Sequence, residues 1–220
     1  MDRLVFPLDV NKIEEALRFT ELLDGYVGVF KIGLELFSSY GPEAVCRIKE
    51  KAKRSKILLD LKLHDIPVTV ERTLRVLESL EVDFVTLHIE PNYNFESKVR
   101  LIGITVLTSL GDEELKIAGY NLSSRDLAKK KAIIAKNLGF SGVVCSGFEV
   151  KEIREVVGRD MIIFVPGIRP SWWMKRDDQK RVVTPKKAVE NGADYIIVGR
   201  PIRNSEDPIK AVKLIEEELK

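Results

Sequence analysis

A short stretch that places charged residues inside an apolar strand pattern constrains this sequence most. Residues 57–66 are Ile-Leu-Leu-Asp-Leu-Lys-Leu-His-Asp-Ile. Because side chains alternate between the two faces of a strand, Asp60, Lys62 and His64 share one face with Leu58. Asp65 falls just past the expected strand end. Taken alone, the stretch fits a half-solvated antiparallel strand whose polar face meets water, so the rest of the chain must decide its setting.

Apolar runs that are typical of buried strands alternate with helical patterns along the whole chain. Such runs lie at residues 4–9, 26–32, 57–66, 84–87, 101–107, 142–145, 161–165 and 195–198. Strands that alternate with helices predict a parallel sheet covered by helices, and a count of eight favours a closed (β/α)₈ TIM barrel. An open, doubly wound sheet of six strands is the alternative.

Local signals mark the helix ends. Helices are expected at residues 11–23, 42–52, 67–80, 124–138, 150–157, 184–192 and 207–219. Asn11 and Glu14 form the pattern of a capping box, whereas Thr184-Pro185 and Asp207-Pro208 combine a cap with a first-turn proline. The segment 90–98 has only scattered apolar positions, so a helix after the fourth strand is expected to be short or missing.

Composition indicates an ordinary globular protein. The 220 residues carry a formal net charge of +2, with 32% charged and 45% hydrophobic residues. This length fits one barrel domain over residues 1–220, and the nearly balanced charge disfavours nucleic-acid binding. The first strand has no signal-peptide pattern before it, and no apolar run reaches the roughly 18 residues of a membrane span. We therefore expect a cytoplasmic protein that does not bind membranes.

The sequence contains no evident catalytic nucleophile. Cys46 and Cys145 are the two cysteines, and both lie in apolar surroundings at a spacing that fits neither a zinc site nor a disulfide framework. Both are expected to be reduced core residues. Ser146 has no nearby histidine and no nucleophile-elbow motif. His64 has a possible functional role, but a histidine in a strand-end turn is more often structural.

Polar and charged residues gather at the carboxyl ends of the expected strands. They are Asp9, Lys31, Asp60, Lys62, Thr108 and Arg200. In a barrel these ends converge on one face, where active sites are built. Parallel strands are buried on both faces, so a barrel leaves no solvent side for Asp60 and Lys62. The barrel therefore favours a shared site over a solvated strand.

Two lysines and three aspartates alternate in this predicted site. They are Lys31, Lys62, Asp9, Asp60 and Asp65. Carboxylates on either side hold each ammonium group protonated. Carboxylates also bind Mg²⁺, but the interleaved lysines would compete with the metal for them. We favour a proton donor over a metal site.

A second candidate feature follows strands seven and eight, where barrels frequently bind phosphate. Pro166-Gly167-Ile168-Arg169 and Gly199-Arg200 close these strands. Glycine allows close backbone approach, and the arginine fork fits phosphate oxygens. The connection from 168 to 183 has the length of a lid and contains Trp172-Trp173 and Gln179. The tryptophans either contact a ligand or pin an open loop to the barrel wall.

Together these residues resemble the orotidine 5′-phosphate decarboxylase family over most of the chain. The most specific match is Asp60-Leu-Lys62-Leu-His-Asp65-Ile66-Pro67 with Thr69 following, which resembles the family's Asp-x-Lys-x-x-Asp signature. Supporting matches are Leu8-Asp9, Lys31-Ile-Gly, Val106-Leu-Thr108-Ser, Pro166-Gly-Ile-Arg169, Asp178-Gln179 and Val198-Gly-Arg200-Pro-Ile. The segment 88–94 and the lid start Ser171-Trp172-Trp173 depart from the family pattern.

The resemblance implies decarboxylation of orotidine 5′-phosphate to uridine 5′-phosphate in pyrimidine biosynthesis, without a metal or an organic cofactor. It implies that Lys62 donates the proton within a catalytic network that includes Asp60, Lys31 and Asp65. The substrate-binding residues that it implies are Asp9, Lys31, Asp60, Thr69, Thr108, Pro166, Arg169, Gln179, Gly199 and Arg200. It also implies a homodimer in which Asp65 and Thr69 reach the site of the neighbouring subunit.

Two other functions remain open at this point. Mg²⁺-dependent sugar-phosphate decarboxylases and synthases of the same superfamily share the Asp-x-Lys-x-x-Asp signature. The Pro-Gly-Ile-Arg and Asp-Gln combination at the phosphate end disfavours them. A barrel that binds a nucleotide phosphate without turnover is the other possibility, because a fold alone does not imply chemistry.

Overall fold

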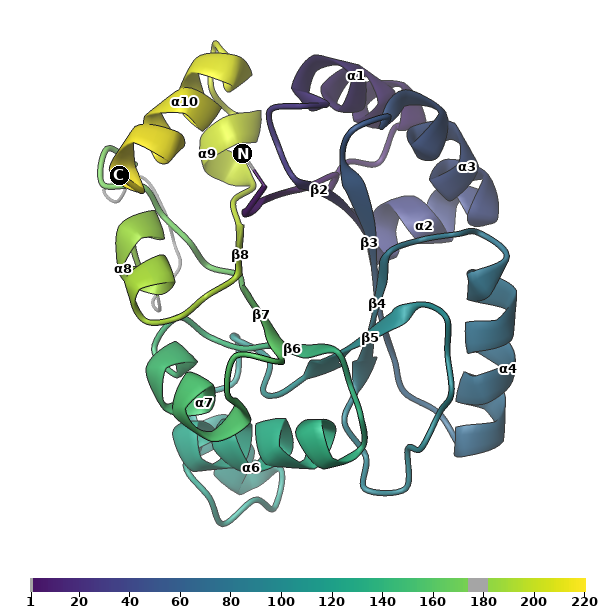
Figure 1. The fold of residues 1–220 in the computed structure, drawn as a ribbon, viewed down its shortest axis with the longest axis vertical. Coiled ribbons are helices and arrows are strands. Elements are labelled where there is room, and N and C mark those ends of the chain that lie inside the picture. Colours follow the sequence, from purple (N-terminus) through teal and green to yellow (C-terminus); the bar gives the residue numbers. More distant parts are fainter. Residues whose placement is uncertain (1, 174–181) are drawn as a thin grey trace.

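The strands of the computed structural model form a closed ring with helices on its outside (Figure 1). The structure describes residues 2–173 and 182–220. The strands are β1 (Leu4–Pro7), β2 (Val29–Gly33), β3 (Lys56–Leu63), β4 (Phe84–His88), β5 (Arg100–Ile104), β6 (Gly142–Val144), β7 (Ile162–Val165) and β8 (Tyr195–Ile197). Each strand pairs in parallel with the next, and β8 pairs with β1. The prediction of a (β/α)₈ TIM barrel is confirmed.

Most of the described helices cover the outer face of the barrel (Figure 1). They are α1 (Ile13–Leu23), α2 (Leu34–Tyr40), α3 (Pro42–Lys51), α4 (Pro67–Glu78), α5 (Asp112–Ile117), α6 (Ser124–Asn137), α7 (Val150–Val157), α8 (Pro185–Glu190), α9 (Arg200–Arg203) and α10 (Pro208–Glu218). Segment 89–99 contains no helix, as its irregular pattern predicts. No helix within the described ranges is long and apolar enough to cross a membrane.

Apolar side chains fill the barrel and the space between the barrel and its helices. The interior layer consists of Val5, Val29, Leu58, Phe84, Ile102 and Phe164. The rings of Phe164 and Tyr195 stack with their centroids 4.5 Å apart, and those of Phe84 and Phe164 meet in a T-shaped arrangement with their centroids 5.2 Å apart. Because this layer closes the middle of the barrel, open space is left only near the strand ends.

Two of the three predicted helix caps are confirmed. The Thr184 side chain accepts a hydrogen bond from the Lys187 amide at the start of α8, and Asp207 does the same for Lys210 at the start of α10. The capping box at Asn11 is wrong, because α1 starts one residue later, with Lys12 at the N-cap and no side-chain cap. Acidic side chains in its first turn favour that end through the helix dipole instead.

Several strand boundaries differ from the predicted ones, and those of the second and fifth strands differ by three residues. The second strand begins at Val29 rather than at residue 26, because the chain turns at Gly25, whose φ of 87° suits glycine. The fifth strand ends at Ile104 rather than at residue 107. There β6 pairs with β5 through only three residues. The Thr105 amide then donates a hydrogen bond to the carbonyl of Val144 as the chain leaves the sheet.

Helices α2, α5 and α9 were not predicted, because none of them is long enough to show an apolar periodicity. The prediction that both cysteines lie in the core is half right. Cys145 is buried, but Cys46 is exposed. Helix α3 buries Ala44, Val45 and Ile48, which turns Cys46 outward.

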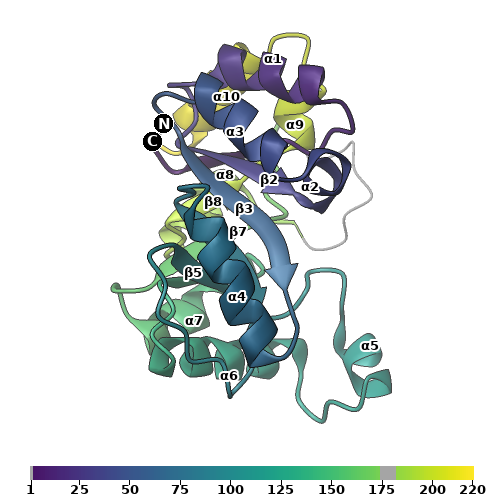
Figure 2. The same cartoon turned by 90° about the vertical axis from the view of Figure 1, so that its right-hand side faces the viewer.

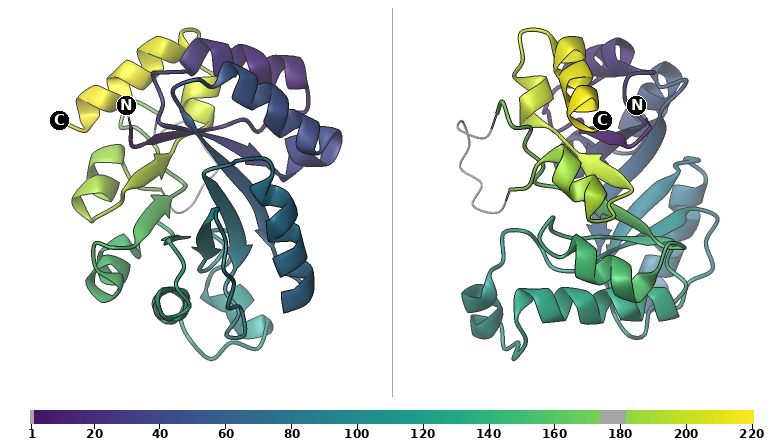
Figure 3. Two further views of the ribbon diagram at one scale, coloured as in Figure 1. Left: turned by 45° about the vertical axis from the view of Figure 1, so that its right-hand side comes forward. Right: turned by 60° about the vertical axis from the view of Figure 1, so that its left-hand side comes forward.

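The carboxyl ends of the strands and the chain termini lie at opposite ends of the barrel. In Figure 2 the arrow of β3 points to the side on which α5 projects, while both termini lie on the other side. The two views of Figure 3 place the termini at that same end. The loops that follow the strands therefore surround one mouth of the barrel.

Candidate active site

A cavity of about 360 Å³ opens at this mouth, within the size range of sites for small ligands. Leu58, from the interior apolar layer, belongs to its lining. The predicted site residues that line it are Asp9, Lys31, Asp60, Lys62, Thr108, Pro166, Arg169, Gly199 and Arg200. They come from loops and strands all around the barrel, so the fold brings together residues that are far apart in the sequence.

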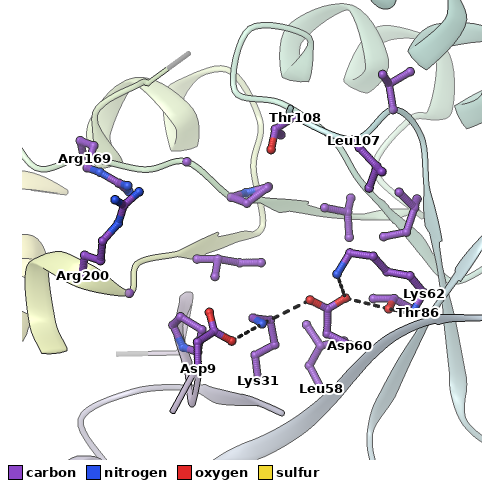
Figure 4. Close-up of a pocket in the computed structure, with 18 of the residues that line it drawn as sticks. Asp9, Lys31, Leu58, Asp60, Lys62, Thr86, Leu107, Thr108, Arg169 and Arg200 are labelled. Atoms are coloured by element: carbon purple, nitrogen blue, oxygen red, sulfur yellow. Dashed lines mark hydrogen bonds and ion pairs between the residues drawn. The ribbon is translucent and has the colours of Figure 1, made fainter. Parts of the chain in front are cut away.

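Four charged residues form a continuous alternating chain along one side of the cavity (Figure 4). The Lys31 ammonium nitrogen lies 2.9 Å from Oδ1 of Asp9 and 3.3 Å from Oδ2 of Asp60. The Lys62 ammonium nitrogen lies 2.8 Å from Oδ1 of Asp60. Asp60 thus stands between two lysines, as the strand parity and the barrel together predict.

Burial and charge oppose one another at the centre of this array. Burial lowers the pKa of Lys31, but the carboxylates of Asp60 and Asp9 outweigh it and hold that pKa above its usual value. Burial raises the pKa of Asp60, but the ammonium groups of Lys31 and Lys62 outweigh it and hold that pKa below its usual value. Both central groups are therefore charged near neutral pH.

A buried threonine that the sequence did not indicate belongs to the same array. Thr86 of β4 lines the cavity, and its hydroxyl donates to Oδ1 of Asp60 at 2.8 Å. The same hydroxyl accepts the backbone N–H of Lys62 at 2.9 Å. Lys62 has a φ of 50°, which is rare for a residue with a side chain. In the sequence, the only signal for Thr86 was its place in the alternation of side chains along β4. That alternation does not show which residues its hydroxyl contacts.

The lining of the cavity also has an apolar part. It includes Ile104, Val106, Leu107, Val144 and Ile197. Val106 and Leu107 belong to a motif of the family resemblance, but none of the five was predicted as a site residue, because an apolar residue at a strand end looks like any core residue. Such a wall lowers the local dielectric constant and strengthens the charge interactions beside it.

Arginine side chains gather on the other side of the cavity. Arg169 and Arg200 point toward one another there, apart from Asp60 and Lys62 (Figure 4). Arg169 is only 4% exposed and donates to the carbonyl of Ile168 at 2.8 Å. Arg203 also lines the cavity and donates to the backbone carbonyl of Asp9. Arg203 was missed because only the single helical turn of α9, which the sequence did not predict, brings it to the cavity together with Arg200.

Two positions at this end of the cavity favour glycine. Gly167 has a φ of 73°, and a Cβ on Gly199 would lie 2.9 Å from the Pro7 ring.

Trp173 is 9% exposed while Trp172 is 40% exposed, so one of the two rings packs against the protein. This favours the pinning role for Trp173. Gln179, predicted to contact phosphate from the lid, lies outside the described residues.

Asp65 and Thr69 do not line the cavity of their own chain. Both are exposed, one past the end of β3 and the other in the first turn of α4. The hydroxyl of Tyr93 accepts the Asp65 amide at 3.0 Å and donates to the Asp65 carbonyl. The side chain that the sequence placed in the array therefore sits on a braced turn at the rim.

The histidines lie beside the site rather than in it. His64 Nε2 is 3.1 Å from Oε1 of Glu90, and the His64 and His88 rings are 4.8 Å apart. Burial, followed by the neighbouring His64, lowers the pKa of His88. Across residues 2–173 and 182–220, no three His, Cys, Asp or Glu side chains are grouped to hold a metal ion. Burial also raises the pKa of the Cys145 thiol, which disfavours a thiolate nucleophile.

Fold and cavity define a (β/α)₈ barrel with a charged site at the carboxyl ends of its strands. The profile of the family described as orotidine 5′-phosphate decarboxylase / HUMPS family matches residues 2–215. The chain belongs to this family.

Individual relatives agree with the family match. An orotidine 5′-phosphate decarboxylase of Desulfosudis oleivorans is 42% identical, with 100% of this chain and 95% of the relative covered. One of Wolbachia pipientis is 41% identical, with coverage of 100% and 99%. The crystal structure of the Lactobacillus acidophilus enzyme of the same name superposes with a TM-score of 0.83 at 30% identity, over 100% of both chains.

Proposed function

We propose that the chain, acting as a single barrel domain over residues 1–220, decarboxylates orotidine 5′-phosphate to uridine 5′-phosphate in pyrimidine biosynthesis. The observation that carries the proposal is the cavity itself, with Asp9, Lys31, Asp60 and Lys62 on one side and an arginine cluster on the other. Its whole-chain relatives bear the name of this activity.

The chemistry needs a positive charge and a proton at one carbon atom. When the bond between C6 of the pyrimidine and its carboxylate breaks, CO₂ leaves and the electron pair stays on C6. The Lys62 ammonium stabilises that charge and transfers a proton to C6, after which solvent protonates Lys62 again. The Lys62 side chain is 32% exposed and that of Lys31 only 10%, so Lys62 is the more accessible donor.

The other charged residues orient and hold the array. Asp60 lies between the two lysines, where it pairs with both ammonium groups and faces the carboxylate that leaves. Lys31 ties Asp60 to Asp9, which in this proposal binds the ribose. Thr108, on the loop after β5, contacts the pyrimidine.

The arginine end binds the phosphate. Arg169 and Arg200 offer guanidinium groups that fit phosphate oxygens, with Pro166 and Gly199 shaping the backbone around them. Gln179 adds a contact from the lid. Binding energy from this remote group helps organise the charged array at the reacting carbon.

A second copy of the chain completes the site in this proposal. Asp65 and Thr69 are exposed at the rim of the barrel, where another subunit can receive them. The active form in this proposal is a homodimer whose active sites are shared across the subunit interface. A cytoplasmic location without nucleic-acid or membrane partners is part of the same proposal.

The proposed reaction uses no metal ion and no organic cofactor, because Lys31 and Lys62 supply the positive charge that a metal would bring. Loss of orotidine 5′-phosphate absorbance after dialysis of the protein against EDTA tests substrate and metal together. We expect full turnover. Activity that disappears with EDTA and returns with Mg²⁺ would favour a metal-dependent relative, and nucleotide binding without turnover would favour a non-catalytic barrel.

A further inference from the structure

The hydroxyl of Thr86 makes hydrogen bonds to both Asp60 and Lys62. Thr86 lies on β4, is 1% exposed, and belongs to neither the Asp-x-Lys-x-x-Asp stretch nor the phosphate end. A threonine hydroxyl has one hydrogen to donate and lone pairs to accept with. Here the hydrogen goes to Oδ1 of Asp60, and a lone pair receives the N–H of Lys62.

The strand pairing explains why this contact exists. Between β3 and β4, Leu59 pairs with Val85 and Leu63 with Leu87, so three residues of β3 lie opposite Thr86 alone. This bulge contains Lys62 and its φ of 50°. Bulges re-aim side chains near active sites, and backbone in this conformation persists only where neighbouring contacts hold it. The Thr86 hydroxyl is such a contact.

The hydrogen bonds also fix the rotation of the Asp60 carboxylate. Oδ1 receives both the Thr86 hydroxyl and the Lys62 ammonium at 2.8 Å, whereas Oδ2 faces Lys31 at 3.3 Å. Each oxygen of the Asp60 carboxylate therefore contacts a different lysine. Without the hydroxyl, the carboxylate would lose a neutral donor, and the part-buried Lys62 amide would lose its acceptor.

We propose that Thr86 is a positioning residue of the active site, whose hydroxyl holds the Lys62 backbone in its bulge and directs the Asp60 carboxylate to the two lysines. This inference rests on the proposed function for its kinetic consequence. Its structural part, the hydrogen bond to Asp60, can be tested without turnover.

The test compares three variants. Thr86→Val keeps the branched shape and removes the hydroxyl, Thr86→Ser keeps the hydroxyl, and Thr105→Val is the matched control. Thr105 is another buried barrel threonine, and its hydroxyl donates to the carbonyl of Val144 outside the charged array. We expect kcat of Thr86→Val to fall by roughly 10- to 100-fold, with affinity for uridine 5′-phosphate changed by less than about threefold. Thr86→Ser restores most of the loss, and Thr105→Val retains wild-type kcat.

A second measurement does not depend on activity. The Asp60 carboxyl, identified by its absence in Asp60→Asn, is titrated by carbon NMR in protein labelled at aspartate. Because the hydroxyl stabilises the carboxylate form, Thr86→Val titrates at higher pH than wild type, and Thr86→Ser and Thr105→Val do not. An unchanged Asp60 titration in Thr86→Val overturns the inference, as does an equal loss of kcat in all three variants.

The two measurements separate this inference from the proposed function. Wild-type protein that does not turn over orotidine 5′-phosphate refutes the function, whereas the titration still decides the role of Thr86. Wild-type turnover with an unshifted Asp60 titration keeps the function and removes Thr86 from the site.

Discussion

The two lysines of the array differ in their surroundings, and this difference supports the roles proposed for them. Lys31 lies between two carboxylates, with its side chain 10% exposed. Lys62 contacts Asp60 alone among the described ion pairs and opens toward the cavity. An ammonium group paired with carboxylates on both sides is suited to an electrostatic role, whereas one paired with a single carboxylate can transfer a proton to a ligand.

Replacement of Lys62 tests this assignment. We expect Lys62→Ala to lower kcat by several orders of magnitude, because the variant loses the proton donor and the charge that stabilises the carbanion. Uridine 5′-phosphate should still bind, since the arginine end is intact. The measurements are single-turnover decarboxylation and calorimetric titration with the product. Lys213→Ala, which removes an exposed lysine of α10, is the control. Near-normal turnover of Lys62→Ala would refute the assignment.

The pH dependence of stability tests the central carboxylate. The pKa of Asp60 in the folded protein is lowered from 3.8. Its contribution is therefore complete above pH 3.8 and is lost as the pH falls through the lower folded value. We expect the difference in unfolding free energy between wild type and Asp60→Asn to be constant from about pH 5 to 8 and to shift against wild type below about pH 4. Thermal unfolding across this range measures it, and a shift in favour of wild type at acid pH would contradict the prediction.

At the scale of elements, the carboxyl-terminal parts of the strands and the segments that follow them carry the site. The bulge in β3 directs Lys62 to Asp60, and the turn after it carries Asp65 to the rim. The loop after β7 and the start of α9 after β8 bring Arg169 and Arg200 together. These two elements are adjacent because β7 pairs with β8.

The phosphate role proposed for these two segments predicts an effect that depends on the substrate. We expect Arg200→Ala to lower kcat/KM for orotidine 5′-phosphate by about 100-fold, because a charge-assisted contact to the phosphate is lost. For the unphosphorylated nucleoside the loss should be less than about threefold. Steady-state kinetics on both substrates measure the difference. Arg159→Ala, at an exposed position, serves as control, and equal losses on both substrates would argue against the phosphate role.

At the scale of the whole molecule, barrel closure makes one site out of residues spread over the chain. Asp9 and Arg200 are distant in sequence, yet both line one cavity because β8 pairs with β1. Asp65 is the exception, since its side chain is exposed outside that cavity. The proposed dimer resolves this exception by placing Asp65 in the partner's site.

Mixed dimers test the shared site. Lys62→Ala and Asp65→Ala proteins, each inactive alone, are unfolded together and refolded as an equal mixture. If Asp65 acts across the interface, each mixed dimer has one intact site, and random pairing returns roughly a quarter of wild-type activity. If Asp65 serves its own subunit, every site lacks one residue and no activity returns. Mass spectrometry confirms that mixed dimers form, and their inactivity would refute the shared site.

The sequence by itself determined the features that depend on local order. Strand and helix patterns predicted the barrel, strand parity placed Asp60 and Lys62 on one face, and the positions after the last strands predicted Arg169 and Arg200 in the site. These predictions succeeded because periodicity and turn residues act within a few neighbours. The cap at Asn11 failed because a one-residue shift of a helix start lies below what such signals resolve.

Only the tertiary structure decided which side chains meet. Thr86 joined the array because the bulge in β3 brought the Lys62 amide and the Asp60 carboxylate to one hydroxyl on the neighbouring strand. Arg203 lines the cavity because a short helix places it there, whereas Asp65 lies outside the cavity because its turn is at the rim. Such contacts depend on strand register and on the rotation of individual side chains, which are set by packing between segments far apart in the sequence.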